Sequence, residues 1–135
     1  MESIDPYQST QFRGIGRLNV ERSGLGAYHK LIEIEDFIAM PELITQMRED
    51  PSHLRYDMIF IDGMHLFDYT LLDFFFADRM LEVNGLILVD DIRHPPVTKF
   101  FEYARQMLCL LLLLALAACS CYVFVLLLFA LLFLY

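Results

Sequence analysis

Residues 56–92, YDMIFIDGMHLFDYTLLDFFFADRMLEVNGLILVDDI, decide the fold. Two short apolar runs, MIFI at 58–61 and LILV at 86–89, are typical of strands buried on both faces of a parallel sheet. Between them, apolar side chains recur every three or four residues and predict a helix: Leu66, Tyr69, Leu72, Phe76 and Met80. Asn84-Gly85 predicts the end of that helix, as a C-cap. The stretch therefore predicts a strand–helix–strand unit.

Each of these two strands ends in acidic residues. Asp62-Gly63 follows the first strand, and Asp90-Asp91 follows the second. Parallel strands joined by one helix form a right-handed crossover, so both carboxyl ends lie at the same edge of the sheet. Open α/β sheets bind their ligands at that edge. We therefore expect a ligand site there.

The rest of the first 106 residues continues the α/β pattern. Ser3-Ile4-Asp5 is too short to be assigned as a strand from periodicity alone. A helix N-capped by Ser9 or Thr10 is expected to run to Arg22, and a strand is expected at 28–35. A helix is expected at 39–49, with Pro41 in its first turn, and another begins at 97–106. We divide the chain into a domain at 1–106 and an apolar segment at 107–135.

Charge is confined to the predicted domain. All 18 acidic residues and all 10 Lys and Arg residues precede Met107, and the net charge is −8. This balance argues against nucleic acid as a partner. The three cysteines lie at 109, 119 and 121, so the domain has neither a disulfide nor a thiolate metal site.

Residues 107–135 contain no charge, glycine or proline over 29 positions. About 20 apolar residues suffice to cross a bilayer, so this segment predicts a transmembrane helix. Lys99 and Arg105 precede it, which favours a single-pass C-terminal tail anchor with a cytoplasmic domain. The alternative is that the segment is an artefact of the gene sequence, in which case the protein is cytoplasmic.

The motif D-G-x-H at 62–65, followed by N-G-L-I-L-V-D-D-I at 84–92, resembles strands four and five of class I S-adenosylmethionine-dependent methyltransferases. The resemblance runs from Ser3 to about Tyr103. It implies a Rossmann-like α/β fold in which this chain supplies parallel strands two to five with their crossover helices. A strand that ends in Asp-Gly is also common in other α/β enzymes, which remain an alternative.

The resemblance implies residues that bind the cofactor S-adenosylmethionine. Asp5, at the end of strand two, is expected to hold the ribose hydroxyls, and Asp36, after strand three, to approach the adenine edge. Asp62 and Gly63 complete the cofactor-binding set. The alternatives from the residues alone are a turn acid before Pro6 for Asp5 and a solvated loop acid for Asp36.

Three acids suggest a metal site that resembles the one in catechol-type O-methyltransferases. Asp62, Asp90 and Asp91 offer the carboxylate oxygens that suit Mg²⁺, and a cation would relieve their mutual repulsion. The alternative is that Asp62 and Asp90 cap helices or line the cofactor cleft without metal. His65 and Asp62 are the candidate catalytic residues, and His65 is the candidate general base. His94 is a weaker candidate for that role. A hydrogen-bonding role for His65 is the alternative.

Two parts of the resembled family are missing from the sequence. The glycine-rich loop after strand one should precede Ser3, and the final antiparallel hairpin should follow strand five. The expected protein is thus a methyltransferase fragment, for O-methylation of a small molecule, that binds S-adenosylmethionine weakly or not at all. The alternative function is a non-catalytic, membrane-anchored interaction module. Open sheet edges would favour self-association.

Overall fold

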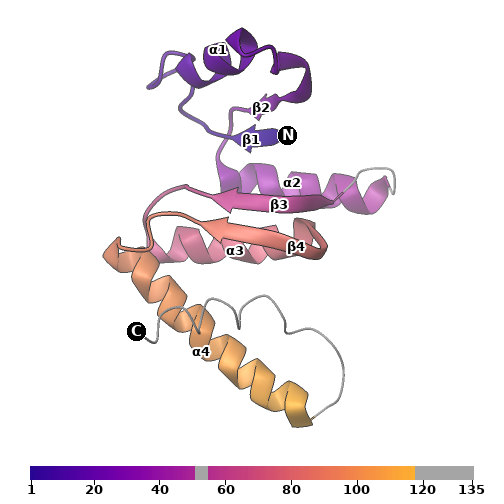
Figure 1. Cartoon of the computed structure of the whole chain (residues 1–135), viewed down its shortest axis with the longest axis vertical. Coiled ribbons are helices and arrows are strands. Elements are labelled where there is room, and N and C mark those ends of the chain that lie inside the picture. The colour runs from indigo at the N-terminus through magenta and orange to yellow at the C-terminus, as the bar shows by residue number, and fades with distance from the viewer. Residues whose placement is uncertain (51–54, 118–135) are drawn as a thin grey trace.

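The computed structural model describes residues 1–50 and 55–117, with side chains described as far as Met107. Strands and helices alternate along the chain (Figure 1). In order they are β1 (Glu2–Ile4), α1 (Ile15–Arg22), the 3-10 helix η1 (Gly26–Tyr28), β2 (Lys30–Ile32), α2 (Asp36–Glu49), β3 (Tyr56–Ile61), α3 (Phe67–Met80), β4 (Leu81–Val89) and α4 (Pro95–Ala117). The predicted α/β class with crossover helices is confirmed.

The four strands form two separate parallel pairs. β1 pairs with β2, and β3 pairs with β4, each in parallel register. No hydrogen-bonded ladder joins β1 to β3 in the described part of the chain. The prediction of a Rossmann-like sheet from strands two to five is therefore met only as short pairs. β1 and β2 span three residues each, which leaves little backbone for pairing.

One face of the β3–β4 pair is covered by α2 and α3 (Figure 1). Met40 and Leu43 of α2 meet Ala77 and Met80 of α3 over Ile61 of β3. Partly buried apolar side chains from all four strands surround this cluster: Ile4, Ile32, Tyr56, Ile59, Ile87 and Val89. The two strand pairs therefore share one hydrophobic core although no ladder joins them.

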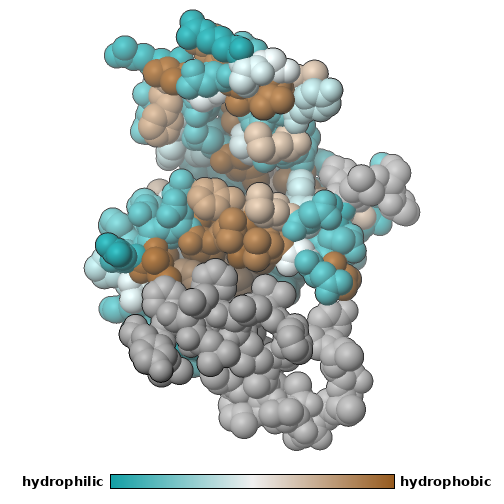
Figure 2. Space-filling model, viewed as in Figure 1, coloured by the Kyte–Doolittle hydropathy of each residue, from teal (hydrophilic) through white to brown (hydrophobic). Residues whose placement is uncertain are grey.

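The opposite face of β3 is open to solvent. Side chains alternate along a strand, so Met58 and Phe60 point away from the core that holds Ile59 and Ile61. Met58 is 59% exposed and Phe60 is 56% exposed. Figure 2 shows an apolar patch over β3 and β4 in the centre of the molecule. The sequence predicted strands buried on both faces, and the structure corrects this because both packed helices lie on one side.

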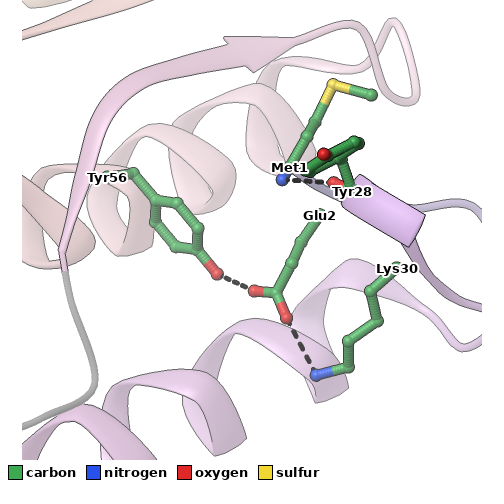
Figure 3. A network of polar contacts seen from close by, with 5 residues as sticks. All are labelled: Met1, Glu2, Tyr28, Lys30 and Tyr56. Carbon is green, nitrogen blue, oxygen red and sulfur yellow. Dashed lines mark hydrogen bonds and ion pairs between the residues drawn. The ribbon is translucent and has the colours of Figure 1, made fainter. Parts of the chain in front are cut away.

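A polar network links the two strand pairs (Figure 3). The Tyr56 hydroxyl, at the start of β3, donates a hydrogen bond to Glu2 Oε2 in β1. Lys30 Nζ in β2 lies 2.8 Å from Glu2 Oε1, and the Met1 ammonium donates to the Tyr28 carbonyl at 2.8 Å. Burial and the Glu2 carboxylate raise the pKa of Tyr56 above its usual value. Glu2 thus receives donors from both pairs.

The predicted end of α3 is wrong by four residues. The helix ends at Met80, and β4 begins at Leu81 in extended conformation. Asn84 adopts a positive φ of 68°, and the register slips from Tyr56↔Leu81 to Met58↔Leu86. Asn84-Gly85 therefore forms an irregularity within β4 rather than a helix cap. Arg55 Nη1 donates to the Arg79 carbonyl at 2.6 Å and closes the end of the helix instead.

Helix and strand limits also differ in the first half of the chain. α1 begins at Ile15, after turns at 6–14, rather than at Ser9 or Thr10. The strand expected at 28–35 is shorter, because η1 includes Tyr28. The helix expected at 39–49 starts three residues earlier, at Asp36. The buried positions Met40 and Leu43 agree with the predicted stripe.

α4 packs on α3 and runs across the predicted domain boundary at 106/107. Val97 and Phe100 are buried, and the Phe100 ring lies 5.4 Å from that of Phe74. Further along the helix, the Tyr103 ring lies 5.9 Å from that of Phe67. The first half of α4 is therefore a charged, amphipathic helix that belongs to the globular part.

The predicted transmembrane helix and membrane localisation are wrong for the residues that the structure describes. Within 1–50 and 55–117, no helix is long and apolar enough to cross a membrane. Within the described residues, the physical reason is that the first half of α4 carries charged side chains at Lys99, Glu102 and Arg105. Residues 118–135, which that prediction also covered, lie outside the described part.

Candidate active site

The carboxyl ends of β3 and β4 lie side by side. The ladder extends one residue past β4, because Asp90 N donates to the Ile61 carbonyl at 2.9 Å. Asp62 directly follows β3, and Asp91 directly follows Asp90, so both acidic residues lie at the same edge of the strand pair. The crossover topology expected from the sequence therefore brings these two carboxylates together.

His65 joins the two acids. Its Nε2 lies 2.7 Å from Asp91 Oδ2 and 3.9 Å from Asp62 Oδ1. One ligand atom from each of the three residues lies within 4.8 Å of the others, a spacing that could hold a metal ion. Two carboxylates and one imidazole fit a divalent cation. The His94 ring stacks on His65 at 4.7 Å and an interplanar angle of 25°, which fixes the plane of the imidazole.

Asp90 is not part of this group. Its Oδ1 accepts a hydrogen bond from Asp91 N at 2.7 Å, so the side chain folds back on its own loop. Asp91 adopts a left-handed backbone with φ of 52°, which is uncommon for a residue with a Cβ. The structure thus gathers Asp62, His65 and Asp91, where the sequence predicted Asp62, Asp90 and Asp91 as ligands. The metal set stays a prediction.

Asp5, expected to bind ribose hydroxyls, is engaged in a local turn. Its Oδ1 accepts from Tyr7 N at 2.9 Å, and its Oδ2 accepts from Gln8 Nε2 at 2.8 Å. This geometry agrees with the alternative interpretation of Asp5 as a turn acid. Asp5 does stand at the carboxyl end of β1, where cofactor contacts were expected.

Asp36 and Gly63 meet a residue that sequence reasoning missed. Asp73 of α3 is 5% exposed and hydrogen-bonds to the Asp36 side chain. Burial and the Asp36 charge raise the pKa of Asp73 to about 7. A Cβ placed on Gly63 would lie 3.1 Å from Asp73 Oδ2 and 3.6 Å from Asp36 Oδ2. The available sequence signal was an acid on the apolar stripe of the helix, between Tyr69 and Ala77.

Tyr7 and Glu35 border the same region. The Tyr7 hydroxyl donates to Glu35 Oε1 at 3.4 Å. The Glu35 charge is the main cause that raises the pKa of Tyr7. Tyr69 packs its ring edge-on against Phe37 at 6.2 Å, one helical turn before Asp73. The carboxyl-end edge is therefore acidic and aromatic from β1 to β4.

A family model described as a methyltransferase domain matches residues 3–92. This match covers about two thirds of the chain and includes β2, β3, β4 and all of β1 except Glu2, with the acids at their ends. The chain belongs to this methyltransferase family. No curated protein and no solved structure matches it significantly. The resemblance expected from the sequence is thus confirmed at the level of the family.

Membership supports a methyltransferase function and, in general, S-adenosylmethionine as the methyl donor. The carboxylates at the carboxyl-end edge are hydrogen-bond acceptors, as the ribose hydroxyls and the adenine amine of this cofactor require. Two pockets among the described residues lie elsewhere, one of about 500 Å³ beside Gln8 and Gly16 and one of about 340 Å³ beside Pro41 and Thr45. Neither is lined by Asp5, Asp36, Asp62 or Gly63.

Proposed function

We propose that this methyltransferase domain acts on the oxygen of a small-molecule hydroxyl. The observation that carries the proposal is the convergence of Asp62, His65 and Asp91 at the carboxyl ends of β3 and β4. A hydroxyl is a poor nucleophile until its proton is removed or acidified. A group that combines a base with two carboxylates serves that need.

A divalent cation is the expected partner of this group. When bound, it lowers the pKa of a coordinated hydroxyl. Asp62 and Asp91 offer carboxylate oxygens, and His65 offers Nε2. Mg²⁺ was expected from an all-oxygen set, and the imidazole donor favours Mn²⁺ or another transition metal over Mg²⁺.

Without a cation, the same residues support general-base catalysis. Asp91 contacts His65 Nε2 at 2.7 Å and stabilises the imidazolium that forms when His65 accepts the hydroxyl proton. His94 holds the ring plane by stacking. In this version Asp62 contributes negative charge near the imidazolium, and no metal is required.

The cofactor is assigned to the neighbouring part of the same edge. Asp36 and Asp62 flank Gly63 there, and Asp5 stands at the end of β1. When bound, S-adenosylmethionine supplies the methyl group on a sulfonium. The chain's own task is to align the acceptor oxygen and to exclude water, because methyl transfer needs little further covalent help. Asp5 has to exchange its bond to Gln8 for the ribose hydroxyls.

The experiment is a methyl-transfer assay on the full chain with labelled S-adenosylmethionine and a panel of small hydroxyl, amine and thiol acceptors. We expect product from hydroxyl acceptors, stimulation by Mn²⁺, and loss in Asp62→Asn and Asp91→Asn. Transfer to amines only, with no effect of these substitutions, would overturn the proposal. Asp78→Asn, which changes an exposed acid on α3, is the matched control.

A further inference from the structure

The strongest unexplained feature is a pair of carboxyl groups beneath the loop that carries Asp62 and His65. Asp36 begins α2, and Asp73 lies in the middle of α3. The two side chains are hydrogen-bonded, and Asp73 is buried. Two carboxylates in contact repel each other, so such a pair requires a shared proton. A carboxylic acid can donate that bond, whereas a carboxylate cannot.

Gly63 lies directly against this pair. The position of its absent Cβ is 3.1 Å from Asp73 Oδ2 and 3.6 Å from Asp36 Oδ2, so any other residue would require the Asp73 carboxyl group to shift slightly. Gly63 immediately follows Asp62 and precedes His65 by two positions. The carboxyl pair therefore packs against the loop at Gly63, and Asp91, which follows β4, contacts the same loop at His65.

We infer that Asp36 and Asp73 form a proton-dependent clasp that positions the 62–66 loop. With the proton present, Asp73 donates to Asp36 and ties α3 to the start of α2 under Gly63. When the proton is lost, the buried Asp73 carboxylate and the half-buried Asp36 carboxylate are both negatively charged and repel each other, so the clasp opens. The contact between Asp36 and Asp73 is independent of the proposed function. The effect of this contact on catalysis through Asp62 and His65 rests on the proposed function.

Other titratable groups occur on the same and neighbouring elements. Glu35 precedes Asp36 and accepts from the Tyr7 hydroxyl, and Tyr69 lies one helical turn before Asp73. The charged residues of α4 that are described, Lys99, Glu102 and Arg105, are exposed, as are Asp57 of β3 and Glu82 of β4. Of the charges described around it, Asp36 is the one that acts on Asp73.

The pH dependence follows from the direction of the shift. The pKa of Asp73 is raised to about 7 in the folded chain from 3.8 in the unfolded chain. The protonated acid is thus favoured by folding, so the clasp stabilises the fold fully below about pH 4 and loses this effect as the pH rises to about 7. Above that pH the stability from this group no longer changes.

The test compares thermal unfolding of the full chain between pH 4.5 and 8.5 for the parent, Asp73→Asn, Asp36→Asn and the control Asp78→Asn. The Asp73→Asn side chain mimics the protonated acid, because its amide donates to the Asp36 carboxylate. We expect the advantage of Asp73→Asn over the parent to be small near pH 4.5 and to grow to roughly 5 °C or more at pH 8. Asp36→Asn should also flatten the profile, and Asp78→Asn should follow the parent.

The positioning role is tested by the Gly63 amide signal in NMR titrations of the same proteins. We expect a step near pH 7 in the parent and in Asp78→Asn that is absent in Asp73→Asn. A step that persists unchanged in Asp73→Asn would overturn the positioning role. Equal destabilisation of Asp73→Asn at every pH would overturn the clasp itself. Neither readout needs methyl transfer, so failure of the proposed function would be seen separately.

Discussion

His65 Nε2 lies 2.7 Å from Asp91 Oδ2, a contact that joins the loop after β3 to the loop after β4. The two residues are 26 positions apart in the chain and are brought together by the parallel pairing of their strands. Asp91 reaches this position through a left-handed backbone that is uncommon outside glycine. Strain of this kind, next to a histidine, is typical of sites that bind or react.

Removal of the Asp91 carboxylate should weaken divalent-cation binding. We expect Asp91→Asn to lower Mn²⁺ affinity by about tenfold or more, because one anionic ligand becomes a neutral amide. Titration calorimetry of the full chain with Mn²⁺ alone measures this.

Asp90→Asn is the matched control for that prediction. Its Oδ1 accepts from the Asp91 backbone, and an amide oxygen can accept the same bond. Mn²⁺ affinity should therefore change little. Equal losses for the two substitutions would show that the three-residue group Asp62, His65 and Asp91 is not the metal site.

Tyr56→Phe should destabilise the fold by about 1.5 kcal/mol, because it removes a hydrogen bond to the Glu2 carboxylate. Glu2 retains its contact with Lys30 at 2.8 Å, which limits the cost. Urea unfolding, followed by circular dichroism, measures the free energy of unfolding. Tyr28→Phe removes a hydroxyl from a side chain that is 74% exposed and should change stability by less than about 0.5 kcal/mol.

Gly85→Ala should cost about 1–3 kcal/mol by overpacking. The new Cβ would lie 2.7 Å from Leu81 Cγ and 2.9 Å from the Glu82 carbonyl oxygen within the irregular start of β4. Gly26→Ala meets nothing closer than 3.6 Å and serves as the control. Chemical denaturation of the two variants compares them, and similar stabilities would contradict the close packing around Gly85.

Phe100→Ala should cost about 3–5 kcal/mol, because the ring is 1% exposed and packs against Phe74. This substitution tests whether α4 is part of the globular core. Phe12→Ala changes a ring that is exposed and should have a small effect. A parent-like melting temperature for Phe100→Ala would mean that α4 contributes little to stability.

Local patterns predicted the fold well where buried strands and helices have distinct periods. The apolar runs at 58–61 and 86–89 and the acids after them are found in β3, β4 and the loops beyond. The prediction that Asn84-Gly85 ends the helix was wrong, because the same residue types occur both at helix ends and at irregular positions in strands. Which of the two forms here depends on the pairing of β4 with Tyr56 of β3. Such long-range pairing is invisible to a local pattern.

The site was predictable in outline only. Strand ends identified Asp62 and Asp91, but the backbone of Asp91 and the inward fold of Asp90 decided which acid reaches His65. Asp73 escaped notice because its role depends on the approach of α2, which delivers Asp36. Both details arise from packing between elements that are distant in sequence.

The division of the strands into two pairs has a consequence for how the molecule opens. β1 and β2 contribute three paired residues each and are held to β3 by side chains rather than by a ladder. Their amides should therefore exchange with solvent deuterium through a local excursion of low free energy, well before those of β3 and α3. The protein would then unfold in two steps: the β1–β2 pair, which ends at Asp5, would unfold locally while the β3–β4 pair, which ends at Asp62, stays folded.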